Sequence, residues 1–216
     1  MKIIDLSIPL AAGRDIECAI PDKLPLYEGF PCEEYLFSFH SHRGCYFETS
    51  AHLFRGGTMT QDVPVEKLMM PAVVARVSKE KTNPIEPEDI LAGMKGNPLA
   101  GDGLIVDTGG REGYFSRRCG TWMVEKKICL LGSSLSRFDT GFVNPTGIFV
   151  ELFKAEIPII AEIHNLEKID HERIFLIVSP MAIEGVCTVP CRVVAMDGNE
   201  PEIEWLTGHL RSGPAK

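Results

Sequence analysis

One short stretch holds most of the residue types that carry out chemistry in proteins: residues 41–54 read SHRGCYFETSAHLF. Four of its side chains can act as metal ligands, acids or bases: His42, Tyr46, Glu48 and His52. Their spacings are all even, and side chains two residues apart point to the same face of an extended strand. With a bend at Gly44, these groups can converge on one cavity, as metal ligands and a general base must. Polar side chains that simply face solvent would show the same spacing.

The same stretch also offers a cysteine. Cys45 is a candidate nucleophile for a thiol hydrolase. Its base would be His52 or His42, and Glu48 would orient that base. A free cysteine is more often a small, buried and unreactive side chain. A regular strand would place His40 on the face of His42, although a position at a strand edge near solvent explains His40 as well.

The elements that must position these groups follow from short apolar or β-branched runs bounded by Gly, Pro, Asp or Asn. Such runs predict strands at 2–5, 36–42, 72–77, 103–107, 128–131, 157–163, 174–179 and 192–196. Helices are predicted at 86–94, where Pro87 suits the first turn, at 145–155, with Asn144 as cap and Pro145 in first position, and at 114–126. Strand-rich ends with only three helices predict an α+β, layered β/β/α domain.

Length and composition set the frame for these elements. A chain of 216 residues, 44% hydrophobic and 24% charged, has the size and composition of one ordinary globular domain. We expect the domain to cover 1–207 and the Gly-, Ser- and Pro-containing end, 208–216, to be a flexible tail.

The net charge of -8, from 30 acidic against 22 basic residues, disfavours nucleic acids and anionic membrane surfaces as partners. No apolar stretch reaches about 18 residues and the N-terminus does not resemble a signal peptide, so we expect a cytoplasmic protein.

Seven cysteines are scattered along the chain without a C-x-x-C pair. This pattern argues against a disulfide framework and a structural zinc site, and predicts reduced thiols. Cys187 and Cys191 bracket a short turn, and we interpret their proximity as accidental rather than as a redox pair. The glycines form no phosphate-binding pattern, which disfavours a nucleotide enzyme.

The segment from His42 to His52 resembles the H-x-G-T-H-x-D-x-P-x-H signature of the cyclase family of metal-dependent hydrolases, which includes bacterial kynurenine formamidase and isatin hydrolase. Further segments resemble other family motifs in the same order, so that the likeness runs from about residue 2 to residue 196. They are IDLS at 4–7, HLF at 52–54, VEKLMMPAVV at 65–74, GLIVDTG at 103–109, residues 127–139, and IPIIAEIHNL at 157–166.

This resemblance implies a swivelling β/β/α fold, usually a homodimer or homotetramer, whose divalent metal activates water to cleave an amide or a strained lactam. In the family, the first two histidines and the aspartate of the signature bind metal, and the last histidine is an acid/base. A later histidine and glutamate complete a second metal position. Carried over to this chain, His42, Glu48 and Glu162 are the metal ligands and His52 is the acid/base.

The match to the signature is incomplete. Tyr46 stands in place of the second histidine, Cys45 in place of threonine, and Ser50 in place of proline. The later histidine falls on Val150, which cannot bind a metal, although His164 could substitute for it. A neutral phenol is a poor ligand, because its pKa is about 10. A two-metal centre is therefore not expected.

Two functions remain open at this point. The first is an amide hydrolase, for an aryl formamide or a lactam, with one Zn²⁺ or Mn²⁺ held by His42, Glu48 and Glu162, and with His52 either as base or recruited as a ligand. The second is a metal-free descendant that binds a small molecule, or that uses Tyr46, Glu48 and His52 as acid and base without hydrolysis. In both, the partner is a small molecule.

Overall fold

The computed structural model describes residues 1–19, 35–79, 82–140 and 146–212, and the side chains up to residue 209. Most of its strands belong to one mixed sheet, with strand order β1-β10-β4-β8-β7-β6-β5-β9. The strands are β1 (Lys2–Asp5), β4 (Tyr46–Glu48), β5 (Met69–Arg76), β6 (Gly103–Asp107), β7 (Leu130–Ser133), β8 (Ile159–Ala161), β9 (Arg173–Pro180) and β10 (Thr188–Asp197). Because β9 also pairs with β10, seven strands close into a barrel, and β1 extends it along one edge of β10.

The four strands β5, β6, β7 and β8 run parallel to one another, whereas every pair that includes β4, β9 or β10 is antiparallel. Parallel strands that are covered on both faces read as continuous apolar runs, and β5 and β6 are of this kind. One apolar cluster takes side chains from all eight strands and fills the barrel, with Phe47 and Val74 among its members. A second cluster, which includes Tyr46, Val73 and Val106, lies between the sheet and the helices.

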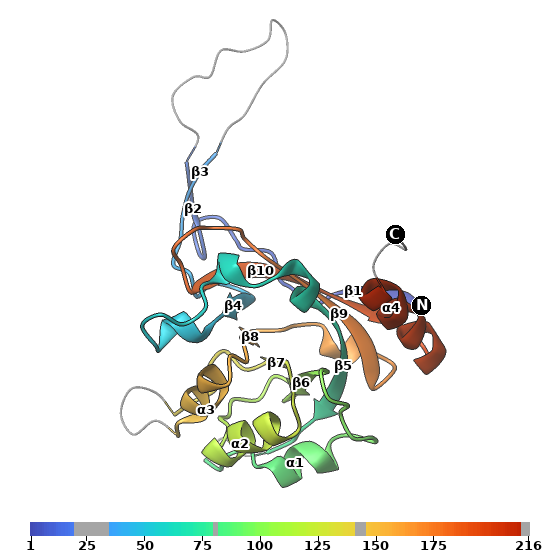
Figure 1. The fold of residues 1–216 in the computed structure, drawn as a ribbon. Coiled ribbons are helices and arrows are strands. Elements are labelled where there is room, and N and C mark those ends of the chain that lie inside the picture. Colours follow the sequence, from blue (N-terminus) through green and yellow to red (C-terminus); the bar gives the residue numbers. More distant parts are fainter. Residues whose placement is uncertain (20–34, 80–81, 141–145, 213–216) are drawn as a thin grey trace, which may run out of the picture.

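Three helices pack against the second cluster on the outside of the barrel: α1 (Pro87–Ala92), α2 (Arg117–Glu125) and α3 (Ile148–Lys154). They lie together on one side of the barrel, and α4 (Glu200–Ser212) lies on another side (Figure 1). Helix α1 begins with a capping box in which the side chains of Glu86 and Asp89 each accept a backbone N–H of the other residue. Short 3₁₀ turns η1 (Ser50–His52), η2 (Thr60–Asp62), η3 (Val65–Leu68) and η4 (Leu166–Lys168) connect the larger elements. None of the helices described here is long and apolar enough to cross a membrane.

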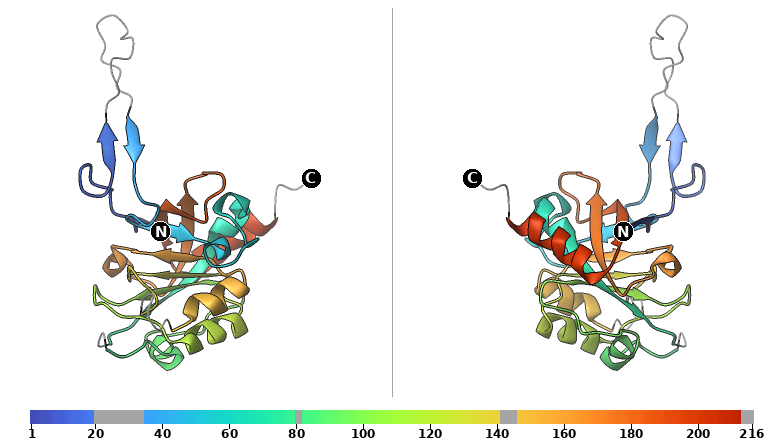
Figure 2. Two further views of the ribbon diagram at one scale, coloured as in Figure 1. Left: turned by 90° about the vertical axis from the view of Figure 1, so that its left-hand side faces the viewer. Right: turned by 90° about the vertical axis from the view of Figure 1, so that its right-hand side faces the viewer.

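Two further strands, β2 (Glu17–Ala19) and β3 (Leu36–Ser38), form an antiparallel ribbon that projects from the barrel (Figure 2). All six residues of this ribbon are exposed. The strand predicted at 36–42 is therefore wrong in its second half. His40 and His42 follow β3 in an irregular connection to β4, because Gly44 turns the chain at a φ of 60°.

The predicted single α+β, β/β/α domain is confirmed, as are the three predicted helices, each slightly shorter than expected. The strands at 2–5 and 103–107 have the predicted bounds. The strands predicted at 36–42 and 157–163 are shorter than expected, and the others are shifted or extended by one to four residues at an end. The predicted cap and first residue of the helix at 145–155, Asn144 and Pro145, lie outside the described residues. Asp139 accepts backbone N–H groups of Thr146 and Gly147, directly before α3, so this buried carboxylate holds the start of the helix.

Helix α4 was not predicted, and the expected domain boundary at 207 falls inside it, so residues 208–212 are helical rather than part of a loose tail. Residues 213–216 lie outside the described residues. The helix begins with a reciprocal pair that was visible in the sequence. The Asn199 side chain accepts the Glu202 N–H at 3.1 Å, and the Glu202 carboxylate accepts the Asn199 N–H at 2.9 Å. Ile203 on its inner face is fully buried, which fixes the helix on the barrel.

Candidate metal centre

Three different elements bring the candidate residues together. Glu48 is the last residue of β4, where it is held between Thr188 of β10 and Ile159 of β8. His52 ends the 3₁₀ turn η1, and His42 lies in the connection that precedes β4. Glycine suits position 44, because the φ of 60° lies in the left-handed region that other residues rarely adopt. A side-chain carbon there would also lie 2.7 Å from Leu10 Cδ2. The predicted bend at Gly44 is thus present.

The side chains of His42, Glu48 and His52 meet at one carboxylate oxygen. Glu48 Oε1 lies 2.9 Å from His42 Nε2 and 3.0 Å from His52 Nδ1. It also accepts a hydrogen bond of 2.9 Å from Thr188 Oγ1. Only 3% of the Glu48 side chain is exposed, against 44% and 42% for His42 and His52. The carboxylate is therefore the floor of the site, and the two imidazoles form its solvent-facing rim.

These contacts set the charges of the metal-free site. Burial opposes ionisation of Glu48, but the hydrogen bonds from His42, His52 and Thr188 outweigh it and lower the pKa of Glu48 to about 2. The hydrogen bond to Glu48 raises the pKa of His52 to about 9, against the opposing effect of burial. At neutral pH the pair is therefore a carboxylate and an imidazolium, and Nδ1 of His52 donates to Glu48.

His42 is oriented from its other side. Ser41 Oγ lies 3.0 Å from His42 Nδ1, so the serine can act as donor or acceptor according to which ring nitrogen carries the proton. When Nε2 is free of its proton, Nδ1–H can donate to Ser41. This kind of outer partner commonly fixes the ring of a metal-ligating histidine.

The donor atoms of His42, Glu48 and His52 lie within 4.8 Å of one another, and each of the three side chains can offer one ligand atom to a metal ion. Two imidazole nitrogens and one carboxylate oxygen suit Zn²⁺, and catalytic zinc sites commonly have three protein ligands and one open position. Both histidines are partly exposed, which leaves the solvent side open. The residues present therefore fit one divalent cation, provided that His52 releases its Nδ1 proton on binding.

A sequence comparison decides the family. The cyclase family model matches residues 4–140, which is more than half of the chain and includes the whole histidine and glutamate cluster. The chain belongs to the cyclase family. No curated protein sequence gave a significant match.

Solved structures share the fold at low sequence identity. An isatin hydrolase bound to the product analogue thioisatinate is 17% identical, with a TM-score of 0.77, over 92% of this chain and 93% of that chain. Isatin hydrolase A from Labrenzia aggregata is 19% identical, with a TM-score of 0.72, over 92% and 94%. A predicted metal-dependent hydrolase from Bacillus stearothermophilus is 18% identical, with a TM-score of 0.71, over 91% and 98%.

Tyr46 and Glu162, which the sequence also assigned to the site, are placed differently from His42, Glu48 and His52. Tyr46 shares the face of Glu48, and its ring lies edge-on to His42 at 4.9 Å, but its hydroxyl donates to the Ser136 carbonyl at 3.1 Å. Burial, with the nearby charges of Glu48 and Glu162, raises the pKa of Tyr46 above its usual value, so it stays a neutral phenol. Glu162, predicted as the third ligand, is not a member of the group of mutually close donors, and burial raises its pKa. The third member of that group is His52.

His40 and His164 also lie outside the group of donors, although both belong to the described part of the chain. His164 lies close enough to Glu162 for its charge to lower the pKa of that carboxyl, so it belongs to the neighbourhood of Glu162 rather than to the cluster. Val150, in the place of the family's later histidine, lies on α3.

The thiol-hydrolase hypothesis for Cys45 is wrong, because its sulfur points away from the site. Cys45 belongs to the apolar cluster inside the barrel, together with Phe47, whereas Glu48 lies on the other face of β4. A different cysteine, which the sequence did not single out for this role, lies beside the site. Cys187 Sγ is 3.9 Å from His52 Nδ1, brought there by the pairing of β10 with β4. No local motif could have revealed this contact, since the two residues are 135 positions apart.

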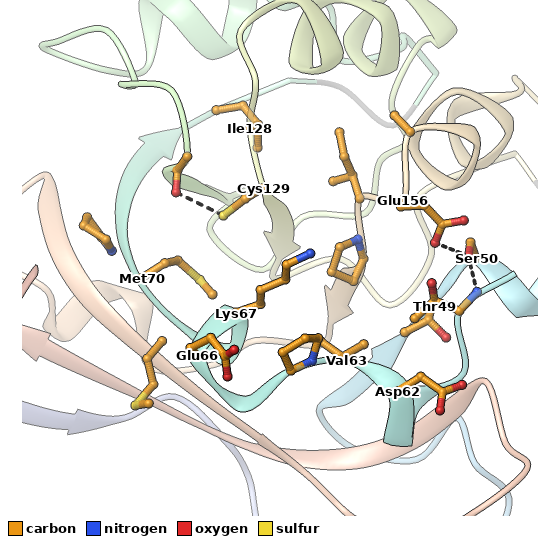
Figure 3. A pocket seen from close by; sticks show the side chains of 18 of the residues that line it. Thr49, Ser50, Asp62, Val63, Glu66, Lys67, Met70, Ile128, Cys129 and Glu156 are labelled. Atoms are coloured by element: carbon orange, nitrogen blue, oxygen red, sulfur yellow. Dashed lines mark hydrogen bonds between the residues drawn. The ribbon is translucent and has the colours of Figure 1, made fainter. Parts of the chain in front are cut away.

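A cavity of about 820 Å³ lies next to the site and is lined in part by the two residues that follow Glu48 in the chain. Thr49 and Ser50 line it, and Ser50 Oγ donates to Glu156 Oε2 across its edge at 2.5 Å (Figure 3). None of His42, Glu48 and His52 is among its lining residues. This cavity is therefore lined by other residues than the candidate metal centre.

Proposed function

We propose that this cyclase-family chain is a metal-dependent hydrolase of an amide or lactam bond, whose single divalent cation is held by His42, Glu48 and His52. The observation that carries the proposal is the convergence of two imidazole nitrogens on one buried, ionised carboxylate, with their outer side open to solvent. The similarity in fold to isatin hydrolases supports a cyclic or aryl amide as the substrate class.

A bound cation at this place would lower the pKa of a water molecule and polarise the substrate carbonyl. The residues of the chain do the rest. Glu48 supplies the negative charge that offsets the cation, and Thr188 and the strands on either side keep its carboxylate in place. Ser41 orients His42. His52 serves as a ligand and not as the acid/base, because one nitrogen faces Glu48 and that nitrogen cannot both bind a metal and carry a proton.

The apolar side of the site is aromatic. The Phe153 ring lies 6.5 Å from the His52 ring, and the half-buried Phe149 stacks on Phe153 at 5.6 Å. Phe153 itself is buried, whereas Phe149 is partly exposed, so Phe149 is the ring against which a planar substrate, such as an aryl formamide or a bicyclic lactam, could pack.

The test is the metal content of the purified protein and its cleavage of isatin and N-formylkynurenine, before and after a chelator and after addition of Zn²⁺ or Mn²⁺. We expect about one equivalent of metal and hydrolysis that disappears with the chelator and returns with the metal. His52→Ala should lower the metal content, while His40→Ala, an exposed histidine in the preceding connection, should leave it unchanged. A His52→Ala variant that keeps its full metal equivalent but loses activity would show that His52 is the acid/base instead.

A second candidate function rests on the same contacts. Glu48 already accepts hydrogen bonds from Thr188 and both histidines, so the buried charge is satisfied without a cation. Protein that binds no metal, does not cleave either substrate and does not change its melting temperature with a chelator would favour a metal-free cyclase-family protein. Such a protein would use the pair Glu48 and His52 for acid–base chemistry or for binding a small molecule.

A further inference from the structure

Two free cysteines face each other across neighbouring strands on the inner side of β4. Cys45, which directly precedes β4, and Cys191 of β10 have their sulfur atoms 3.9 Å apart, with the Cys191 S–H as donor and the Cys45 sulfur as acceptor. Their backbones are joined as well, since Cys191 N–H donates to the Cys45 carbonyl at 2.8 Å. The two residues are 146 positions apart in the sequence, so only the β4–β10 pairing brings them together.

The geometry points to a modification site: we propose that Cys45 and Cys191 form a reversible disulfide when the protein meets hydrogen peroxide. Opposite residues of an antiparallel pair joined by backbone hydrogen bonds have Cα atoms about 5.5 Å apart, which lies within the range that a disulfide spans. The sulfur atoms need only side-chain rotation to approach further, and no strand has to move.

The pair is accessible to a small oxidant although both side chains are buried, with 3% and 9% exposed. Both cysteines line a cavity of about 220 Å³, together with Arg43 and Arg192. Such a volume admits peroxide, since a water molecule occupies about 30 Å³.

The two sulfur atoms have different roles. Cys191 donates its S–H to the Cys45 sulfur, so Cys45 is the attacking sulfur and Cys191 the resolving one. This hydrogen bond, and then burial, raise the pKa of Cys191 well above its usual value. Cys45 gives up its thiol proton and attacks one peroxide oxygen, the O–O bond breaks, and hydroxide leaves and takes up that proton to become water. Cys45 is now a sulfenic acid. Cys191 sulfur then attacks the Cys45 sulfur, the S–O bond breaks, and a second water leaves with the Cys191 proton. Both sulfur atoms are oxidised and both peroxide oxygens are reduced.

The other described cysteines do not share this arrangement. Cys119 is buried among the residues under the helices, where burial raises its pKa to about 12. Cys187 lies beside His52 on the other side of the strand pair, and Cys18 is exposed on the projecting ribbon. They therefore serve as internal references for oxidation at the Cys45–Cys191 pair.

The experiment treats the reduced full-length protein with peroxide, blocks the remaining thiols with iodoacetamide, and maps peptides by mass spectrometry without reduction. We expect a cross-linked peptide pair containing Cys45 and Cys191, the loss of two hydrogen atoms from the intact mass, and full reversal by dithiothreitol. Since the disulfide closes a long loop, the oxidised protein should melt at least about 5 °C higher than the reduced protein.

Variants separate this pair from general oxidation. Cys191→Ser should abolish the cross-link and leave a Cys45 sulfenic acid that dimedone traps, whereas Cys119→Ser should cross-link like the wild type. The proposal fails if Cys45 and Cys191 are both recovered as iodoacetamide-labelled thiols under conditions that oxidise the exposed Cys18. It also fails if the cross-link joins Cys187 to Cys191. Both outcomes are read from the wild-type protein, so they do not depend on the folding of a variant, and neither depends on the proposed hydrolase activity.

Discussion

The side chains on the two faces of β4 lie in opposite kinds of environment, one polar and partly open to solvent and the other apolar and buried. On the outer face, Glu48 is a buried charge that three hydrogen-bond donors compensate, and its histidine partners reach solvent. On the inner face, Phe47 is fully buried in the barrel, and Cys45 beside it faces another thiol. One strand can hold both a polar site and a packed core, because successive side chains point to opposite sides of a sheet. Changes to the two faces should therefore have separate effects.

The largest expected effect is on the outer face. Glu48→Gln removes the charge on which both imidazoles converge, so the protein should lose its metal, and amide hydrolysis should fall by about 10³-fold or more. Metal analysis and initial rates measure this. Glu162→Gln is the matched control, because Glu162 lies outside the donor group, and it should retain the metal. Equal loss of metal in both variants would return Glu162 to the ligand set and contradict the proposed site.

The largest effect on stability should come from the inner face. Phe47→Ala leaves a cavity among the barrel side chains and should lower the free energy of unfolding by about 3–5 kcal/mol. Urea denaturation measures the change. In the fraction that remains folded, we expect metal stoichiometry to stay near that of the wild type. If Phe47→Ala abolished metal binding in folded protein, the two faces of β4 would not be independent.

The charge pair on the outer face predicts a pH dependence for the metal-free protein. The pKa of His52 is raised to about 9. Its contribution to the free energy of unfolding is therefore complete below about pH 6.5 and is lost as the pH rises from about 6.5 to 9. The pKa of Glu48 is lowered to about 2, so its contribution to the free energy of unfolding is lost as the pH falls from about 4.5 toward 2. Because His52 is more than a third exposed, we expect a loss of only about 1 kcal/mol between pH 6 and pH 9.

Chemical denaturation of the chelated protein across this range measures the loss. In Glu48→Gln, the free energy of unfolding should change less between pH 6 and pH 9, since the neutral amide no longer stabilises the imidazolium. An unchanged slope between pH 6 and pH 9 in this variant would show that the pH dependence arises outside the pair.

The smallest effect should come from Tyr46, which shares the outer face but not the donor group. Tyr46→Phe removes the hydrogen bond to the Ser136 carbonyl and should cost about 1 kcal/mol of unfolding free energy. Metal content and the rate of hydrolysis should stay near wild type. A loss of activity without loss of metal would instead support the acid/base role predicted for Tyr46 from its spacing.

Much of the site could be predicted from the sequence, because it depends on local periodicity. The even spacing placed Tyr46 and Glu48 on one face of the strand, and Tyr46 indeed belongs to the apolar cluster under the helices, whereas Phe47 belongs to the cluster inside the barrel. The bend at Gly44 was predicted in the same way, and its left-handed φ is present. The donors at His42 and Glu48 followed from the likeness to the cyclase signature, and the family match supports that likeness. The start of α4 was also visible, as Asn199 and Glu202, and was missed.

The sequence by itself thus determined the family, the layered fold and which residues of β4 share a face. Only the tertiary structure decided which distant groups complete each face. It placed His52 rather than Glu162 next to His42, and it set Cys191 opposite Cys45 and Cys187 beside His52. The physical reason is that local patterns fix the direction of a side chain, whereas its neighbour across a sheet depends on pairing between strands far apart in the chain. In this barrel, β4 and β10 are separated by about two thirds of the sequence. Their register decides which residues lie beside the candidate metal centre and which cysteine lies opposite Cys45.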